Sequence, residues 1–428
     1  MTRAIMVRHI LAALVTALAL VPPAATADEG PTALLLSPAT SPVSAVSSGS
    51  ETPVPRLWTG TWAAAASGTV AARPGASFRN VLHLSVGGSA LRVRLTNRLG
   101  TEPLRLGAVT VALQEPGEPK SPNAEPGSMR TATFAGAPTV TIPAGQDRVT
   151  DAVDLVVPYG ANLLVTVHTP DDSGPATYHR TAKQTNFVAL SGDWADAEDG
   201  DAYTRTTTSW YYVTGVDVLD APAAGSVVAL GDSLTDGGGT TSDTNRRWPD
   251  RLADRFAALP PNRRLGVLNA GISGNRLLLD GVGPRALSRF GADVLSRTGV
   301  RAVIVFEGIN DINGTPAETD PLAFEQAYRT LVTRAHARGI RVIGATITPY
   351  AGHAQWKEAR ESVRRTVNTF IRGSGLFDAV VDFDAAVRDP EFPHRMRAAY
   401  DPGDHLHFND AGMRAMADAI DLADLMRL

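Results

Sequence analysis

The sequence of 428 residues contains no cysteine. Without thiols the chain has no disulfides, no zinc–thiolate site and no cysteine nucleophile, so its fold depends on core packing alone. Lysine is nearly absent too, since only Lys120, Lys183 and Lys357 occur and all other basic side chains are arginines. The net charge of −4 does not indicate nucleic acid or an anionic membrane surface as a partner. We find no metal-ligand spacing, no phosphate-binding glycine loop and no aromatic–basic patch, so the sequence predicts no metal, no cofactor and no nucleic-acid partner.

Long apolar runs are equally scarce, and the main one lies at the N-terminus. Ile10 to Val21 is apolar, two arginines precede it and two prolines follow it. This run is too short to span a bilayer comfortably and is typical of a signal peptide. Ala25-Thr26-Ala27 then fits a cleavage site, which predicts a signal peptide over residues 1–27, a cut after Ala27 and a secreted protein without stable membrane insertion. An uncleaved N-terminal anchor is the alternative. Residues 28–56 are rich in serine, proline and threonine and are predicted to be a disordered linker.

The length predicts two or three domains at about 150 residues each. Residues 57–222 alternate apolar and polar positions with a period of two, and proline, glycine, asparagine and aspartate interrupt them often. This pattern predicts an all-β sandwich, jelly-roll-like domain. The predicted strands are Val81–Val86, Leu91–Leu95, Val109–Leu113, Val140–Ile142 and Leu163–Val167. Gly87-Gly88, between the first two, predicts a hairpin.

The pattern changes in residues 223–428, where short apolar runs alternate with amphipathic stretches. The runs are Val227–Leu230, Leu265–Leu268, Val300–Phe306, Val342–Ile347 and Val380–Phe383. Helices are expected over Pro321–Arg338, over Ala354–Ile371 and after Asn409, which is a plausible N-cap. Such alternation predicts a parallel five-stranded sheet in a three-layer α/β/α sandwich. Ligands of these sheets bind at the carboxyl ends of the strands, which places the functional loops after Leu230, Leu268, Phe306 and Ile347.

Four short motifs occupy these loops and the C-terminal region. They are Gly231-Asp232-Ser233-Leu234, Asn269-Ala270-Gly271-Ile272-Ser273-Gly274-Asn275, Gly308-Ile309-Asn310-Asp311 and Asp404-His405-Leu406-His407. In this order they resemble the four sequence blocks of the SGNH (GDSL-type) hydrolase family, and the resemblance covers roughly Val227 to Leu428. Trp248-Pro249, at the start of a predicted helix, is also similar to that family. The resemblance implies a flavodoxin-like α/β fold and a serine carboxylic ester hydrolase.

A serine hydroxyl needs a base within hydrogen-bond reach to act as a nucleophile. Ser233 follows the first strand of the α/β half, and His407 is the candidate base. Asp404 lies three residues before His407, so one loop can present both side chains and the carboxylate can orient the imidazole. His405 is the competing base, but no carboxylate stands three residues before it. In isolation, Ser233 and His407 would be interpreted as ordinary turn and loop residues.

The family pattern also implies an oxyanion hole formed by the Ser233 N–H, the Gly274 N–H and the Asn310 side-chain amide. Asp232, Asn269 and Asp311 are expected to tie the loops together, although ordinary turn capping explains them equally well. His353 and Tyr350 follow the fourth strand and are candidates to line the pocket.

The resemblance leaves the substrate open: a small-molecule ester or a polysaccharide-linked ester, with short acyl groups or carbohydrate esters favoured. A lipase or lysophospholipase, an acyltransferase that uses the same acyl-enzyme, and a non-catalytic glycan-binding protein are the alternatives. The pairing of a β-sandwich with such a domain resembles polysaccharide deacetylases. Aromatic residues of the β part are therefore candidates for stacking on sugars, and the alternative is that they belong to its core. These residues are Trp58, Trp62, Trp210, Tyr211 and Tyr212. The sequence does not indicate the oligomeric state.

Overall fold

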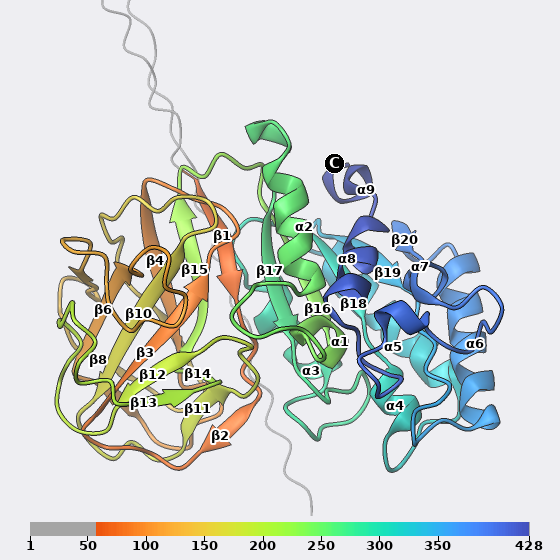
Figure 1. Ribbon diagram of the computed structural model, residues 1–428, viewed down its shortest axis with the longest axis horizontal. Helices are drawn as coiled ribbons and strands as arrows, with labels where there is room; N and C mark the ends of the chain where they lie inside the picture. Colours follow the sequence, from red (N-terminus) through yellow and green to blue (C-terminus); the bar gives the residue numbers. More distant parts are fainter. Residues whose placement is uncertain (1–56, 428) are drawn as a thin grey trace, which may run out of the picture. The chain divides into compact units, whose positions relative to one another are not determined.

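The computed structural model describes residues 57–427. The predicted signal peptide (1–27) and linker (28–56) therefore lie outside the described residues. All described residues belong to one compact unit, Pro55–Leu428. Its first part contains antiparallel strands up to Leu219 and its second part contains a parallel sheet from Ser226 onward (Figure 1). The division into separate domains at residue 222 stays a prediction.

The antiparallel half contains two main sheets, as the period-two pattern predicted. The four-stranded sheet has the order β1 (Trp58–Ala63), β15 (Val213–Leu219), β4 (Ala90–Thr96), β9 (Asp147–Val149). The six-stranded sheet has the order β13 (Arg205–Thr207), β12 (Asn186–Ala189), β3 (Ala76–His83), β10 (Asn162–Thr169), β6 (Ala108–Leu113), β7 (Arg130–Thr131). A three-stranded sheet, β14 (Trp210–Tyr211), β11 (Ala176–His179) and β2 (Gly68–Val70), and a pair, β5 (Leu104–Leu106) with β8 (Val140–Ile142), complete it. Apolar side chains from both main sheets form one buried cluster, which is the packing of a β-sandwich.

The predicted hairpin at Gly87-Gly88 is wrong. β3 belongs to the six-stranded sheet and β4 to the four-stranded sheet, so the chain crosses from one sheet to the other at these glycines. A Cβ on Gly87 would lie 2.4 Å from the Val157 carbonyl oxygen, and one on Gly88 would lie 2.5 Å from the Leu219 carbonyl oxygen. The glycines therefore serve close backbone approach and not a tight two-residue turn.

The aromatic residues proposed for sugar stacking belong mainly to the core. Trp62, Trp210 and Tyr212 are only 6%, 3% and 3% exposed. The rings of Trp62 and Trp210 meet edge to face, with their centroids 5.0 Å apart. Tyr211 stacks on Phe78 at 4.6 Å. These contacts are the packing that the core interpretation expects.

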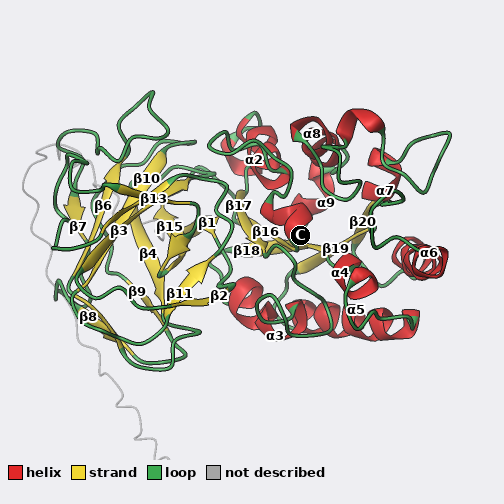
Figure 2. Cartoon of the chain, turned by 60° about the horizontal axis from the view of Figure 1, so that its bottom comes forward, coloured by secondary structure: helices red, strands yellow, loops and turns green. Residues whose placement is uncertain are grey.

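The second half is a parallel five-stranded sheet, as predicted. Its order is β17 (Gly266–Gly271), β16 (Ser226–Gly231), β18 (Val300–Phe306), β19 (Arg341–Ala345), β20 (Ala379–Val381). Every residue of β16 is buried, because helices cover both faces of the sheet and a continuous apolar run is required there. Figure 2 shows α2 (Trp248–Ala257) and α8 (Asp410–Asp418) on one face, with α3 (Ala286–Phe290) and α5 (Pro321–His336) on the other. The other helices are α1 (Ser233–Asp236), α4 (Ile309–Asn313), α6 (Glu358–Gly373), α7 (Phe383–Val387) and α9 (Leu422–Met426).

The start of α8 agrees with the sequence prediction, and the start of α6 does not. The Asn409 side chain caps α8 by accepting hydrogen bonds from the Ala411 and Gly412 N–H groups, which confirms the predicted N-cap. By contrast, α6 begins at Glu358 and not at Ala354, so residues 354–357 belong to the loop that precedes it. Within residues 57–427, none of the helices combines the length and the apolar character that crossing a bilayer requires.

Candidate active site

Ser233 lies at the carboxyl end of β16, as the first residue of the short helix α1. The Asp232 side chain caps this helix and accepts a hydrogen bond of 2.9 Å from the Leu234 N–H. Aspartate is a strong N-cap residue, so the local sequence fixes the turn that presents the serine. Ser233 is 7% exposed, which leaves its hydroxyl at the edge of the sheet with limited access to water.

The hydroxyl of Ser233 forms a chain of hydrogen bonds with His407 and Asp404. His407 Nε2 lies 2.9 Å from Ser233 Oγ, and His407 Nδ1 lies 2.6 Å from Asp404 Oδ2. Because a carboxylate only accepts hydrogen bonds, Nδ1 carries the proton, and Nε2 is free to accept the serine proton. The structure thus brings the three residues together in the order that base-assisted nucleophilic attack requires.

Asp404 is held in its ionised form by its own loop. Its second oxygen, Oδ1, accepts hydrogen bonds from the backbone N–H groups of Leu406 and His407 at 3.0 and 2.9 Å. Burial acts to raise the pKa of Asp404, but the hydrogen bonds from His407 and Leu406 outweigh it and the pKa is lowered. The carboxylate is therefore available to stabilise an imidazolium at His407.

His405 has an acidic partner that sequence spacing did not reveal. Its Nδ1 lies 2.5 Å from Asp401 Oδ2, four residues earlier instead of three. The presence of a nearby carboxylate in the sequence therefore does not show which of His405 and His407 is the candidate base. The 2.9 Å contact with Ser233 does, because only His407 makes it among the described histidines.

The three expected oxyanion donors lie on three different loops. Within the described part of the chain, neither the Ser233 N–H nor the Gly274 N–H donates a hydrogen bond to another protein group. Gly274 has a φ of +84°, a conformation that favours glycine. The Asn310 amide donates one hydrogen to the Asn275 carbonyl oxygen at 2.9 Å, which fixes its orientation and leaves its second hydrogen available.

Arg289 is a buried residue behind these loops that sequence reasoning missed. Its guanidinium donates to the Gly231 carbonyl at 2.9 Å and to the Ala270 carbonyl at 2.6 Å, at the ends of β16 and β17. It also donates to Asn275 Oδ1 at 2.9 Å, and so holds the segment that follows Gly274. No local motif marks this arginine, because the three loop groups that it holds lie 14 to 58 residues away along the chain.

Three carboxyl groups are buried behind the nucleophile. Burial raises the pKa of Asp232 to about 7, and the neighbouring Asp311 carboxylate adds to the rise. Burial, together with Asp232, raises the pKa of Glu307 well above its ordinary range, although Arg289 donates to its Oε1 at 3.2 Å. Burial also raises the pKa of Asp311, which accepts hydrogen bonds from the Leu277 and Leu278 N–H groups. Asp311 thus ties its loop to residues 277 and 278, as expected, whereas Asp232 makes the ordinary turn cap that was the alternative.

The raised pKa of Asp232 predicts that the free energy of unfolding depends on pH in an unusual way. A carboxyl whose pKa rises on folding favours the folded state fully below its ordinary pKa, and that contribution is lost as the pH rises through the folded value. For Asp232 the loss falls between pH 4 and about 7. The asparagine in the variant Asp232→Asn can still accept from Leu234 but has no proton to lose. Relative to the wild type, the free energy of unfolding of this variant should rise over this interval by up to about 1.4 kcal/mol per pH unit.

Urea unfolding of both proteins at pH 4, 5.5 and 7 measures this difference. Asp418→Asn, at an exposed position of α8, is the control and should follow the wild type at every pH. A difference between Asp232→Asn and the wild type that does not change with pH would contradict the raised pKa.

Asn269 makes the loop contact expected of it. Its Nδ2 donates to the Thr235 carbonyl oxygen at 2.8 Å and its Oδ1 accepts from the Gly271 N–H at 2.9 Å, which joins the end of β17 to α1.

His353 and Tyr350 follow β19, with their ring centroids 6.4 Å apart. Burial lowers the pKa of His353 and the charge of Asp404 opposes it. A Cβ on the neighbouring Gly352 would lie 2.8 Å from His405 Cγ, so this segment packs against the loop that contains His405 and His407. Neither His353 nor Tyr350 forms a hydrogen bond with Ser233 in the described structure.

A run of three glycines follows α1, and Gly238 is its middle residue. A Cβ on Gly238 would lie 2.5 Å from His407 Cδ2 and 3.0 Å from His407 Nε2. The imidazole therefore packs directly on this backbone, and a larger residue would displace it from Ser233. The repeated glycine was a visible signal in the sequence, but its role depends on His407, far along the chain.

Gly238→Ala is expected to lower kcat by at least about 10²-fold, because a displacement of about 1 Å is enough for such a loss. Gly281→Ala is the matched control, since a Cβ at that position would meet nothing within 4 Å. Steady-state kinetics on a chromogenic ester, together with the Tm of both variants, tests this expectation. Equal kcat values for the two variants would mean that His407 is not confined by Gly238.

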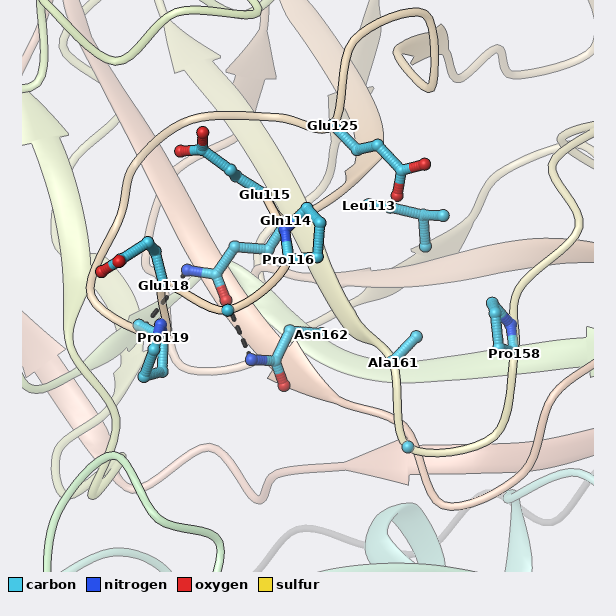
Figure 3. A pocket seen from close by; sticks show the side chains of 12 residues that line it. Leu113, Gln114, Glu115, Pro116, Glu118, Pro119, Glu125, Pro158, Ala161 and Asn162 are labelled. Atoms are coloured by element: carbon cyan, nitrogen blue, oxygen red, sulfur yellow. Dashed lines mark hydrogen bonds between the residues drawn. The ribbon is translucent and has the colours of Figure 1, made fainter.

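A cavity of about 370 Å³ lies elsewhere, on the antiparallel half (Figure 3). Gln114 and Asn162, which line it, bond to each other, with Asn162 Nδ2 2.9 Å from Gln114 Oε1. None of the predicted catalytic residues lines this cavity. Among residues 57–427, no group of three or more His, Asp or Glu side chains has the arrangement of a metal site.

Solved structures similar to this chain include several esterases. A G-D-S-L family lipolytic protein from Desulfitobacterium hafniense is 24% identical, with 45% of this chain and 96% of that chain covered and a TM-score of 0.35. A carbohydrate acetylesterase from Sinorhizobium meliloti is 16% identical, with 45% and 95% covered and a TM-score of 0.37. The aryl esterase of M. smegmatis is 19% identical, with 45% and 94% covered and a TM-score of 0.36. No curated protein matches the chain.

The comparison with protein families identifies the α/β half. Residues 229–415 match the GDSL-like lipase/acylhydrolase family. The match begins in β16, just before Ser233, and includes all four motifs as far as Asp404-His405-Leu406-His407. The α/β half of this chain, with its parallel five-stranded sheet, therefore belongs to the GDSL-like lipase/acylhydrolase (SGNH) family.

Proposed function

We propose that this chain is a secreted serine esterase that cleaves carboxylic esters through an acyl-enzyme on Ser233. The observation that carries the proposal is the continuous hydrogen-bond chain from Ser233 Oγ through His407 to Asp404. An ester hydrolase of the GDSL family needs such a base-assisted serine.

The proposed reaction has two halves with the same residues in reversed roles. Ser233 Oγ attacks the ester carbonyl while His407 Nε2 takes its proton, and the charge on the carbonyl oxygen develops toward the N–H donors of Ser233 and Gly274 and the Asn310 amide. The imidazolium, stabilised by Asp404, then gives the proton to the departing alkoxide, which leaves as an alcohol. Water repeats the sequence with His407 as its base and releases the carboxylic acid.

Short acyl groups and carbohydrate-linked esters are the substrates we propose. Several polar side chains belong to the proposed site: His353 feels the charge of Asp404, His405 lies on the same loop as His407, and the Asn310 amide is a proposed oxyanion donor. A sugar hydroxyl or a small acetyl group is compatible with such a surface, whereas a long alkyl chain requires an apolar groove.

One observation favours the lipase-type alternative. Leu279 and Val282 are 39% and 37% exposed. Val282 also lies against Gly274, since a Cβ on that glycine would be 3.2 Å from Val282 Cγ2. An exposed apolar side chain next to a proposed oxyanion donor is a place where an alkyl chain could lie.

Purified protein from Asp28 onward, assayed on p-nitrophenyl acetate, butyrate, octanoate and palmitate, tests the proposal and separates the two substrate classes. We expect turnover to be highest on acetate or butyrate, acetate release from acetylated xylan, and a covalent adduct on Ser233 after treatment with a sulfonyl fluoride. A maximum on palmitate would favour the lipase type, and ester formation with added glycerol would favour an acyltransferase. Polysaccharide binding without any turnover or adduct would overturn the proposal.

Secretion has its own test. The proposed signal peptide predicts that the protein found in the culture medium begins at Asp28, after the cut at Ala27. N-terminal sequencing of that protein measures this directly, and a chain retained in the cell pellet with its first residues intact would contradict it.

A further inference from the structure

His179, in the antiparallel half, contacts the helix that presents the nucleophile. It ends β11, is 3% exposed, and its Nε2 lies 3.0 Å from Asp236 Oδ1. Asp236 is the last residue of α1, the short helix that begins at Ser233. One side chain of the antiparallel half therefore reaches directly into the framework of the candidate active site.

The partners of His179 require both of its ring nitrogens to carry hydrogen. Nδ1 faces the Ala65 carbonyl oxygen at 2.8 Å, and Nε2 faces the Asp236 carboxylate and, at 3.3 Å, the Thr181 carbonyl oxygen. Carbonyl and carboxylate oxygens only accept hydrogen bonds, so the ring satisfies all of them as an imidazolium. Burial acts to lower the pKa of His179, but the charge and hydrogen bond of Asp236 outweigh it and the pKa is raised. His179 and Asp236 thus form a buried ion pair, with both side chains 3% exposed.

The second oxygen of Asp236 holds the loop that bears Gly274. Asp236 Oδ2 accepts hydrogen bonds from the Ser273 N–H at 2.9 Å and from Ser273 Oγ at 2.6 Å. Ser273 is bonded covalently to Gly274, whose N–H is one of the proposed oxyanion donors. A continuous series of contacts therefore runs from His179 through Asp236 and Ser273 to the oxyanion loop.

We propose that His179 is a positioning residue for the oxyanion loop, and that the antiparallel half acts in the reaction through it. This inference rests on the proposed esterase function. A buried ion pair adds little net stability, because the loss of hydration offsets the attraction between the charges. Its effect is geometric: the fixed imidazolium holds the Asp236 carboxylate in one orientation, and that orientation sets the backbone of Ser273. This contact links the antiparallel half to the loops of the candidate active site. A glycan-binding module that could be removed without loss of activity would not need such a link.

The test compares His179→Ala and His179→Gln with the matched control His168→Ala. His168 is a buried histidine of the same half, 8% exposed, and its Nδ1 contacts Ser77 Oγ and the Ala76 carbonyl, both within that half. We expect His179→Ala to lower kcat about 10- to 100-fold with KM changed less than about threefold, because the oxyanion donors act mainly in the transition state. His179→Gln, whose amide can donate to Asp236, should recover most of the loss. His168→Ala should keep the wild-type kcat.

Hydrogen exchange at the Ser273 amide gives a measurement that does not depend on turnover. In His179→Ala this amide should exchange at least about tenfold faster than in the wild type, because its acceptor is no longer held, whereas His168→Ala should leave it unchanged. A kcat loss no larger than that of His168→Ala, or an unchanged exchange rate at Ser273, would overturn the inference. If His179→Ala fails to fold, His179→Leu, which fills the buried site but cannot donate to Asp236, replaces it and is measured alone and combined with Ser273→Ala: losses in kcat that simply multiply would exclude action through Ser273. A wild type without esterase activity would overturn the proposed function, and the exchange rates would still decide the positioning role.

Discussion

Ser233→Ala should lower kcat for p-nitrophenyl acetate by about 10⁶-fold, to the level of the remaining binding and oxyanion contributions. The Ser233 hydroxyl oxygen is the proposed nucleophile, and no other described serine lies within hydrogen-bond distance of His407. KM should change little, because the Oγ atom contributes more to the chemical step than to substrate binding. The Tm should stay close to that of the wild type, since the substitution removes one partly buried hydroxyl and a single hydrogen bond.

The matched control is Ser288→Ala, an exposed serine of α3 whose hydroxyl bonds only to the Arg285 carbonyl. It should keep full activity. Residues that act as a unit show strongly non-additive losses, so Ser233→Ala combined with His407→Ala should be no slower than Ser233→Ala alone. Activity that survives in Ser233→Ala, in protein free of contaminating esterase, would show that the nucleophile lies elsewhere.

Local patterns in the sequence predicted the elements of the α/β half well. The run Val300–Phe306 matches β18 at both ends, and Asn409 caps α8, because both features depend on neighbouring residues. The order of motifs along the chain also placed Ser233, Gly274 and Asn310 at the carboxyl edge of one sheet, where parallel strands bring their ends together. These expectations needed only the strand–helix alternation and the family resemblance.

Long-range contacts account for what the sequence did not predict. The Gly87-Gly88 hairpin failed because glycine serves tight turns and close backbone contacts alike, and the partner strands lie far away in sequence. The link between His179 and Asp236 joins residues 57 positions apart. Arg289 has no motif of its own, although it holds three loops of the site. A buried polar group is recognisable only when its partners in space are known.

Asp404→Asn should lower kcat by about 10⁴-fold, mainly through the tautomer of His407. In the wild type, Asp404 Oδ1 accepts from two backbone N–H groups and Oδ2 accepts from His407 Nδ1. An asparagine has only one acceptor oxygen, and the two backbone donors are fixed by the loop. Its amide NH₂ is then directed at His407 Nδ1, which must give up its hydrogen to accept this bond. The hydrogen moves to Nε2, and the imidazole can no longer take the proton of Ser233.

The same loop contains a matched control for this substitution. Asp401 bonds through one oxygen to His405 Nδ1 and through the other to the Gly403 and His405 N–H groups, the arrangement of Asp404 and His407 in a neighbouring turn. Asp401→Asn therefore disturbs an equivalent Asp–His pair that does not contact Ser233, and it should keep kcat within about threefold of the wild type, as surface substitutions outside the chemistry usually do. Steady-state kinetics of the two variants, with ¹⁵N NMR of the histidine rings to identify the tautomers, separates the explanations. If both variants lose activity alike, the stability of the loop matters and not the tautomer of His407. If Asp404→Asn loses activity alone and its Nε2 carries hydrogen, the carboxylate acts by holding His407 as a base.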